Sequence, residues 1–217
     1  TPDAFVARLA ERLTIEPVCG WRRTTHSTGL HIGVQDQAQA DHVYVGAVPP
    51  LGRLDCAMLR GAARLARQYG DATLRFTPWQ SLLLPNVRRE HADEVLGGMR
   101  QLGLLCDADQ ALSQLIACTG STGCGRGLAD TKGDARQLAA LLQRHGDAVN
   151  VHLSGCPRSC AAAHIAPVTL LAVTPGHYDL YFREAGQPGF GALHARNLTI
   201  DAVGALLDAR SRSPLDA

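Results

Sequence analysis

The cysteines constrain the fold of this chain more than any other feature of its sequence. Four of the seven fall in two close pairs, Cys118-x5-Cys124 and Cys156-x3-Cys160. Nothing marks the chain as secreted, and an odd number of cysteines argues against a disulfide framework. Paired thiols at short spacing are typical of a metal or cluster site, so we expect the second half of the chain to fold around one.

The segments before each pair favour a common site. Residues 112–117 and 148–153 are apolar runs that predict strands, and they lead into Cys118 and Cys156. Two strand ends can present both cysteine loops to one point. Glycine allows tight turns and close backbone approach, and the loops contain Gly120, Gly123, Gly125 and Gly155.

The donor set favours a [4Fe–4S] cluster, which needs four thiolates. Two alternatives stay open. A structural zinc site usually pairs its cysteines at x2–4 spacing, for which the x5 pair is wide. Free cysteines are also often simply buried as small apolar residues. We interpret Cys19, Cys56 and Cys106 in that ordinary sense, with Cys56 and Cys106 packed against core faces.

The pattern before the cysteines predicts a ferredoxin-like half-unit. Asp55 can cap a helix, and Gly70 can end it. The expected order is β-α-β-β-α, most of a β-α-β-β-α-β unit. The segments are a strand at 42–48, a helix from 55 to about 68, strands at 73–77 and 81–84, and a helix at 90–102.

The second half predicts an α/β layer domain. Its expected elements are the two strands before the cysteines, a helix at 134–144, a hairpin at 167–173 and 178–182, and a closing helix at 201–210. Residues 1–40 are expected to be an N-terminal segment or linker, with a short helix at 3–13 and a loop or hairpin at 24–39. The expected domains are residues 41–105 and 106–217, and the overall class is α+β with an α/β second part.

Composition excludes several classes of protein. Lys and Arg number 21 against 20 Asp and Glu, and this net charge of +1 lacks the footprint of a dedicated nucleic-acid binder. The chain is 46% hydrophobic and 19% charged, which excludes a disordered chain. No apolar run reaches membrane-spanning length, and no stretch has a signal-peptide layout. We therefore expect a cytoplasmic protein without nucleic-acid or membrane partners.

Four segments resemble a known superfamily, the siroheme nitrite/sulfite reductases. They are VPPLGRLDCAMLRGAARLA (48–66), LRFTPWQSLLLPNV (74–87), IACTGSTGCGRGLADTKGDARQLAALL (116–142) and HLSGCPRSCAAAHIAPVTLLAV (152–173). The resemblance covers roughly residues 43–182. Within the superfamily, "TPW", "LLLP" and "ADTKGDA" look closer to the precorrin-3B synthase family. "GCPRSC" is equally at home in nitrite and sulfite reductases.

This resemblance implies a fold and an activity. The fold is a nitrite/sulfite reductase ferredoxin-like half-domain followed by a [4Fe–4S]-binding α/β domain. The activity is a monooxygenase of aerobic cobalamin biosynthesis, which hydroxylates C20 of precorrin-3A with O2 and forms a lactone. The implied cofactors are the [4Fe–4S] cluster, which delivers electrons from a donor, and a mononuclear non-haem iron. Siroheme is not expected, because the tetrapyrrole is the substrate. In siroheme relatives the last cysteine, here Cys160, bridges cluster and haem iron.

Two other functions remain as alternatives. One is a siroheme-dependent nitrite or sulfite reductase domain, and the other is a non-catalytic electron-transfer half-module. Members of the superfamily generally contain two units related by pseudo-twofold symmetry, and this chain resembles only the C-terminal one. A second unit or a homodimer is therefore an expected partner.

The candidates for binding a tetrapyrrole are mostly cationic, because guanidinium groups bond carboxylates in pairs. No residue is assigned a catalytic role, and the nearest histidines for an iron are His152 and His164. For each candidate the alternative is an ordinary surface or core side chain. Lys132 stands out as the only lysine, and Trp79 is a further candidate for the ring pocket. The substrate-binding candidates are Arg53, Arg75, Gln80, Arg126, Lys132 and Arg158.

Overall fold

The structure is a computed structural model that describes residues 2–14, 31–142, 150–162, 166–184 and 187–212. Short 3-10 helices lie at Pro50–Gly52, Arg89–His91 and Ala111–Gln114. The other elements are α1 (Pro2–Ala10), β1 (Gly33–Asp36), β2 (His42–Ala47), α2 (Cys56–Tyr69), β3 (Arg75–Phe76), β4 (Leu82–Arg88), α3 (Ala92–Gln101), β5 (Leu115–Ala117), α4 (Thr131–Leu142), β6 (Val151–Ser154), β7 (Val168–Thr174), β8 (His177–Phe182), β9 (Ala192–Thr199) and α5 (Ile200–Arg212).

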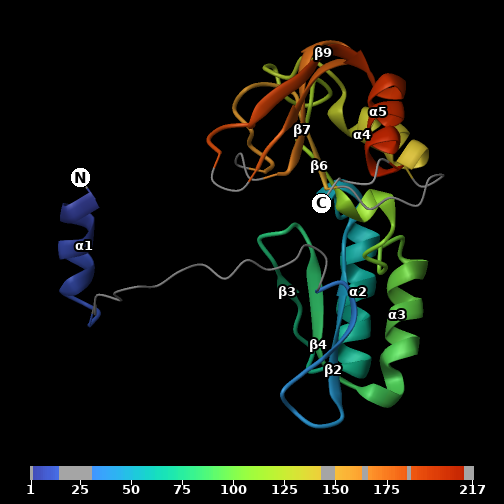
Figure 1. The fold of residues 1–217 in the computed structure, drawn as a ribbon. Helices are drawn as coiled ribbons and strands as arrows, with labels where there is room; N and C mark the ends of the chain where they lie inside the picture. The colour runs from blue at the N-terminus through green and yellow to red at the C-terminus, as the bar shows by residue number, and fades with distance from the viewer. Residues whose placement is uncertain (1, 15–30, 143–149, 163–165, 185–186, 213–217) are drawn as a thin grey trace.

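The first sheet has the strand order β1-β2-β4-β3. Strands β2 and β3 both run antiparallel to β4 and are therefore parallel to each other, with α2 as the crossover between them. This split β-α-β arrangement is the ferredoxin-like pattern, so that prediction is confirmed. Strand β1 adds to the outer side of β2, and α2 and α3 lie together on one face of the sheet (Figure 1).

Local sequence explains why this unit forms. The Asp55 carboxylate accepts the N–H of Met58 at 2.8 Å and so caps the start of α2, as its position predicts. Val43 and Val45 alternate with more exposed neighbours along β2 and are fully buried. They join Ala62 and Ala66 of α2 in one core, because alternate strand residues point to the same face.

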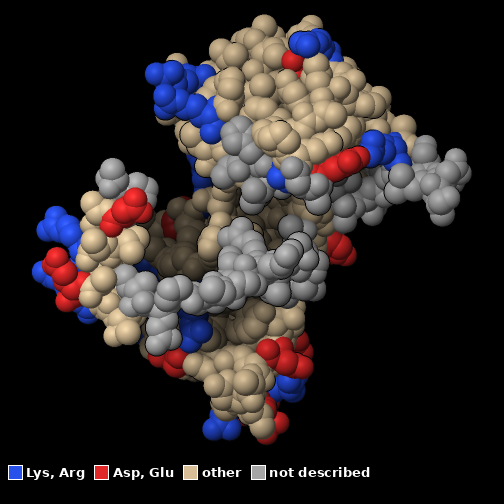
Figure 2. Space-filling model, turned by 60° about the vertical axis from the view of Figure 1, so that its left-hand side comes forward, with Lys and Arg blue, Asp and Glu red and all other residues tan. Residues whose placement is uncertain are grey.

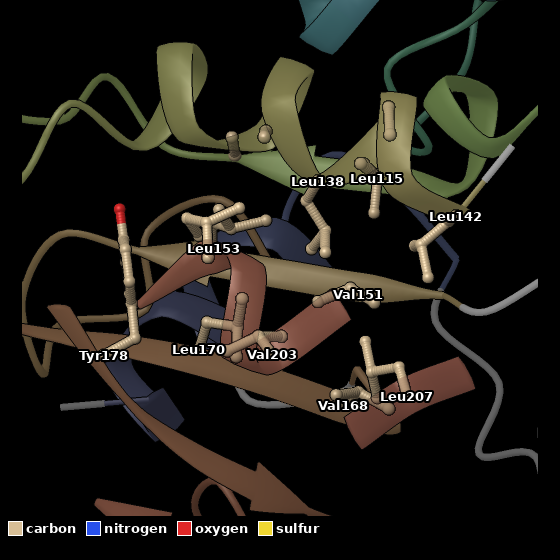
Figure 3. Close-up of a cluster of buried hydrophobic side chains, with 14 of the residues drawn as sticks. Leu115, Leu138, Leu142, Val151, Leu153, Val168, Leu170, Tyr178, Val203 and Leu207 are labelled. Atoms are coloured by element: carbon tan, nitrogen blue, oxygen red, sulfur yellow. The ribbon is translucent and has the colours of Figure 1, made fainter. Parts of the chain in front are cut away.

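The second sheet has the order β5-β6-β7-β8-β9. Strands β5, β6 and β7 are parallel, and β8 and β9 continue the sheet antiparallel. Helix α4 connects β5 to β6, and α5 packs beside it (Figure 1). Figure 3 shows their apolar side chains meeting those of the sheet, including Leu138, Leu153, Leu170 and Val203. The mixed α+β class expected from the sequence is confirmed.

The strand predictions differ from the structure in instructive ways. The predicted strand at 112–117 starts as a 3-10 turn, and only Leu115–Ala117 pairs in the sheet. The predicted strand at 73–77 shortens to Arg75–Phe76, because the Asp71 carboxylate binds the N–H and hydroxyl of Thr73 and holds a turn there. Strand β9 was not predicted, since it is a mostly exposed edge strand without apolar alternation.

The limits of the two parts stay a prediction. Strand β1 lies within residues 1–40 but pairs with β2, and a bridge between Val48 and Leu105 fastens the end of the first part. Cys19 and His164 lie outside the described residues. Cys106 is buried in the first core as predicted, but Cys56 is exposed, so the prediction that it packs against a core face is wrong. In the described part of the chain, none of the helices has the length and apolar character that crossing a bilayer requires.

Candidate functional site

The two cysteine loops begin at the same edge of the second sheet. Strands β5 and β6 are parallel neighbours, with Ala117 paired to Leu153. Cys118 directly follows β5, and Cys156 follows the end of β6 after one residue. Because parallel strands end at one edge, the two loops emerge side by side, as the sequence predicts.

Backbone hydrogen bonds join the two loops. The N–H of Cys118 donates to the carbonyl of Leu153 at 3.2 Å, and the N–H of Leu128 donates to the carbonyl of Gly155 at 2.9 Å. The N–H of Gly155 also donates to Sγ of Cys118 at 3.1 Å. A thiol of the first loop therefore lies against the residue that precedes Cys156. N–H donors to sulfur are one of the ways in which proteins set cluster potentials.

Glycines make this close approach possible. Gly120 has a φ of +68°, and a Cβ there would lie 2.7 Å from the carbonyl oxygen of Ala129. A Cβ at Gly127 would lie 2.5 Å from the backbone carbon of Gly120. At Gly155 the nearest atoms would be the Cα of Gly127 at 3.2 Å and Sγ of Cys118 at 3.4 Å. Larger residues would push the loops apart.

The four cysteines of the two sequence pairs are all free thiols, and they are exposed to different degrees. Cys118 and Cys156 are half-buried, while Cys124 and Cys160 are exposed. Two loops that are joined at their bases thus carry four unpaired thiols, which fits the donor set of a [4Fe–4S] cluster. Within the described residues, which include all four of these cysteines, no three His, Cys, Asp or Glu side chains are grouped so that they could hold a single metal ion. The structure thus joins the bases of the loops but does not gather three of the thiols at one point.

The first turn of α4 forms hydrogen bonds with Cys118 and with the residue before it. The Thr131 hydroxyl donates to the carbonyl of Cys118 at 2.8 Å and lies 3.7 Å from its Sγ. The Lys132 ammonium donates to the carbonyls of Leu51 at 2.5 Å and Ala117 at 3.0 Å. Burial is the main cause that lowers the pKa of Lys132. The lysine therefore points inward rather than toward an external ligand.

The ferredoxin-like part contacts the first turn of α4 and the second cysteine loop. Leu51, the acceptor of Lys132, belongs to the 3-10 turn after β2. Gln80, on the turn between β3 and β4, donates to the carbonyl of Ala161 at 3.4 Å, one residue beyond Cys160. A Cβ at Gly52 would lie 2.2 Å from the Gln80 side chain. Gln80 and Lys132 thus connect the two parts beside the cysteine loops.

The other predicted binding residues lie on the surface. Arg53, Arg75, Arg126 and Arg158 are exposed, and Arg53 is near enough to Lys132 to lower its pKa. Trp79 is 54% exposed, and its ring lies 5.3 Å from that of His31. Figure 2 shows charged side chains in small groups over a largely uncharged surface on the face it presents.

The candidate iron ligand His152 does not face the cysteine loops' surface. It is fully buried within β6, in the interior of the second sheet. The predicted mononuclear iron site therefore has no support from the described residues, since no metal-binding group of three includes this histidine. Sequence reasoning placed it near the cysteines by distance along the chain, which does not determine the direction of a strand side chain.

One buried pair close to Cys118 was not predicted from the sequence. The Tyr178 hydroxyl on β8 donates to the Asp134 carboxylate on α4. Burial, followed by this hydrogen bond, raises the pKa of Tyr178, and the nearby Cys118 adds to the rise. Asp134 belongs to the "ADTKGDA" segment, but nothing in the sequence around Tyr178 indicates its partner.

Comparisons with known proteins show what this chain is similar to. Residues 35–102 match the family model of the nitrite/sulfite reductase ferredoxin-like half domain. The chain is 36% identical over 143 residues to the chloroplastic ferredoxin–nitrite reductase of Zea mays. This aligned region covers 64% of this chain and 25% of that protein. It is 34% identical over 148 residues to sulfite reductase (ferredoxin) 2 of Mycolicibacterium paratuberculosis, covering 64% and 26%.

A solved structure supports the same relationship at the level of the fold. The Mycobacterium tuberculosis NirA protein superposes with a TM-score of 0.74 at 23% identity, over 99% of this chain and 43% of that one. The chain is thus related, at the level of the superfamily, to nitrite and sulfite reductases. It spans about a quarter of the length of these curated relatives.

The comparisons correct the predicted reaction. The interpretation as a precorrin-3B synthase-like monooxygenase, with C20 hydroxylation of precorrin-3A, is wrong, because the matching relatives are nitrite and sulfite reductases. The alternative of a reductase is the better supported of the sequence hypotheses. The argument against siroheme depended on the monooxygenase reaction and loses its basis with it.

Proposed function

We propose that this chain is the cluster-binding unit of a siroheme-dependent nitrite or sulfite reductase. The observation that carries the proposal is the 3.1 Å hydrogen bond from the N–H of Gly155 to Sγ of Cys118. It joins the two cysteine loops at one edge of the sheet. In this proposal residues 41–105 are the ferredoxin-like half-domain and residues 106–217 bind the cluster.

The proposed ligands of the [4Fe–4S] cluster are the thiolates of Cys118, Cys124, Cys156 and Cys160. When bound, the cluster supplies single electrons. The chain holds Cys118 in place: the Thr131 hydroxyl donates to its carbonyl, and Gly155 donates its N–H to its sulfur. Because ligation couples to folding, loss of one thiolate is expected to loosen both loops.

Siroheme is the proposed second group, and Cys160 is the proposed link between the two. Cys160 is exposed, which suits a ligand shared with a bound tetrapyrrole. The exposed guanidinium groups of Arg126 and Arg158 lie on the same two loops. They are proposed to bind siroheme carboxylates, because the planar fork of arginine pairs with carboxylates. Arg53 and Arg75, on the half-domain, are proposed for the same role.

The proposed electron donor is a ferredoxin, because the relatives named above are ferredoxin-dependent reductases. The proposed substrate is a small oxyanion, nitrite or sulfite. A second unit, from another chain or a second copy, is proposed to cover the exposed side of the cluster loops. The support for the electron donor, the substrate and the second unit is the similarity to longer relatives, of which the chain matches a part.

The proposal is tested by loading the full chain with iron and sulfide under anaerobic conditions and then titrating it with siroheme. Wild type and Cys56→Ser, which changes an exposed cysteine on α2, should each take up a full cluster. Cys124→Ser should lose it. Siroheme should bind wild type with haem-type absorption bands and bind Cys160→Ser more weakly.

Two results would overturn parts of this proposal. Full iron and sulfide content in Cys124→Ser would refute the ligand assignment. A complete cluster in a chain that binds no siroheme would favour the electron-transfer module over the reductase unit.

A further inference from the structure

Lys132 is a buried cation that joins the two parts of the molecule. The residue is 9% exposed, and its ammonium donates to the carbonyls of Leu51 and Ala117. Leu51 belongs to the ferredoxin-like half-domain, and Ala117 is the last residue of β5, directly before Cys118. One side chain therefore connects the half-domain to the strand end that carries the first cysteine.

Among the residues that the structure describes, no carboxylate forms an ion pair with this ammonium. Two carbonyl oxygens satisfy hydrogen bonds but do not neutralise a cation, and an isolated buried charge is costly. Arg53 and Arg136 are charged neighbours of the same sign, and the ammonium bonds the carbonyl of Ala117, the residue directly before Cys118. The negative charge that compensates Lys132 is therefore expected on the thiolate of Cys118 and on the group that this thiolate ligates.

The residue type also fits a connecting role. Lys132 is the only lysine in a chain with 21 basic residues, all the others being arginine. An ammonium is a compact point charge with three rotatable donors, whereas a guanidinium is a planar fork. Two carbonyls from different segments, converging on one nitrogen, suit the ammonium.

We propose that Lys132 is a positioning residue of the cluster site, fastening the half-domain to the Cys118 loop and holding a positive charge beside the Cys118 thiolate. The fastening of the half-domain to the Cys118 loop rests on the two hydrogen bonds that Lys132 forms within the chain. The electrostatic role rests on the proposed function, because it concerns the bound cluster. A fixed positive charge favours the more negative, reduced form of the cluster and so raises its reduction potential.

The first experiment measures the fastening by hydrogen exchange in the full chain without added iron. The variant Lys132→Met removes both hydrogen bonds, and the amides of Arg53 and Cys118 should exchange at least tenfold faster than in wild type. Arg67→Gln is the matched control, since it removes an exposed positive charge on α2 that does not act on Lys132, and it should leave both amides unchanged. If Lys132→Met does not fold, Lys132→Gln replaces it. Wild-type protection in the variant that folds would overturn the fastening.

The second experiment measures the electrostatic role by a redox titration of the loaded chain, followed by electron paramagnetic resonance. At a fixed potential, the ratio of reduced to oxidised cluster should fall at least tenfold in Lys132→Gln, a shift of about 59 mV for one electron. Arg67→Gln should stay near wild type. Equal potentials in the two variants would refute the electrostatic role. A wild-type chain that takes up no cluster would overturn both the proposed function and this role, while hydrogen exchange still decides the fastening.

Discussion

Replacing Gly127 by alanine tests the close packing of the cysteine loops. A Cβ at this position would lie 2.5 Å from the backbone carbon of Gly120, 2.7 Å from the nitrogen of Ser121 and 2.9 Å from the oxygen of Gly120. All three atoms are backbone, so no flexible side chain can move away. Ordinary contact begins at 3.4 Å, and the two segments must separate by close to an ångström.

The expected cost follows from that displacement. Overpacking of a tightly packed region typically destabilises by about 1–3 kcal/mol, and here it also separates the thiols of the first loop from Gly155. Gly125→Ala is the matched control, because a Cβ there has nothing within 4 Å. Urea unfolding of the full chain measures the free energy, and iron content after loading measures the site.

Gly127→Ala should lose stability in this range and take up less iron, while Gly125→Ala should match wild type in both measurements. A Gly127→Ala variant with wild-type stability and full iron uptake would refute the argument that backbone contact between the segments shapes the site.

Three further predictions concern residues outside the cysteine loops. Tyr178→Phe removes a buried hydrogen bond to the Asp134 carboxylate and should cost about 1.5–3 kcal/mol in urea unfolding at pH 7. The pKa of Tyr178 is raised above 10.0 in the folded chain, so the unfolded chain loses this proton at a lower pH. The stabilisation from Tyr178 is therefore fully present below pH 10 and is lost as the pH rises above it, and Tyr178→Phe should reduce this loss. Burial raises the pKa of Cys106 to about 11, so iodoacetamide at pH 8 should spare it and modify the exposed Cys56, as read by mass spectrometry; equal labelling of both in the folded chain would contradict this. Gly97→Ala, at an open position in α3, should stabilise the chain by up to about 1 kcal/mol in thermal unfolding, and a loss of stability there would be contrary to the helix assignment.

The sequence was sufficient to predict the architecture around the cysteines. Apolar runs before Cys118 and Cys156 predicted strands that end at a common edge, and the pairing of Ala117 with Leu153 agrees. The cap at Asp55 and the order β-α-β-β-α were equally visible, because both depend on local patterns. Strand β9 escaped detection because an exposed edge strand needs no alternating apolar residues.

The contacts that shape the site were not predictable in the same way. Lys132 bonds to the carbonyl of Leu51, a residue far away in the chain, and a backbone carbonyl carries no signal in the sequence. The pairing of Tyr178 with Asp134 depends on how β8 and α4 pack together. Only the fold brings such groups within reach of each other.

The predicted reaction failed for a different reason. Short segments such as "TPW" and "ADTKGDA" decided between related families, although similar loops can serve several reactions. A sequence identity of 36% over 143 residues to a nitrite reductase outweighs a resemblance of a few residues in short segments.

The most direct test of the central claim is to purify the full chain anaerobically and count iron, acid-labile sulfide and zinc in the sample that gives the visible spectrum. The account predicts about four irons and four sulfides per chain, with a broad sulfide-to-iron absorption band. A colourless chain with stoichiometric zinc would contradict it, because Cys118, Cys124, Cys156 and Cys160 would then hold a structural metal and no electron carrier.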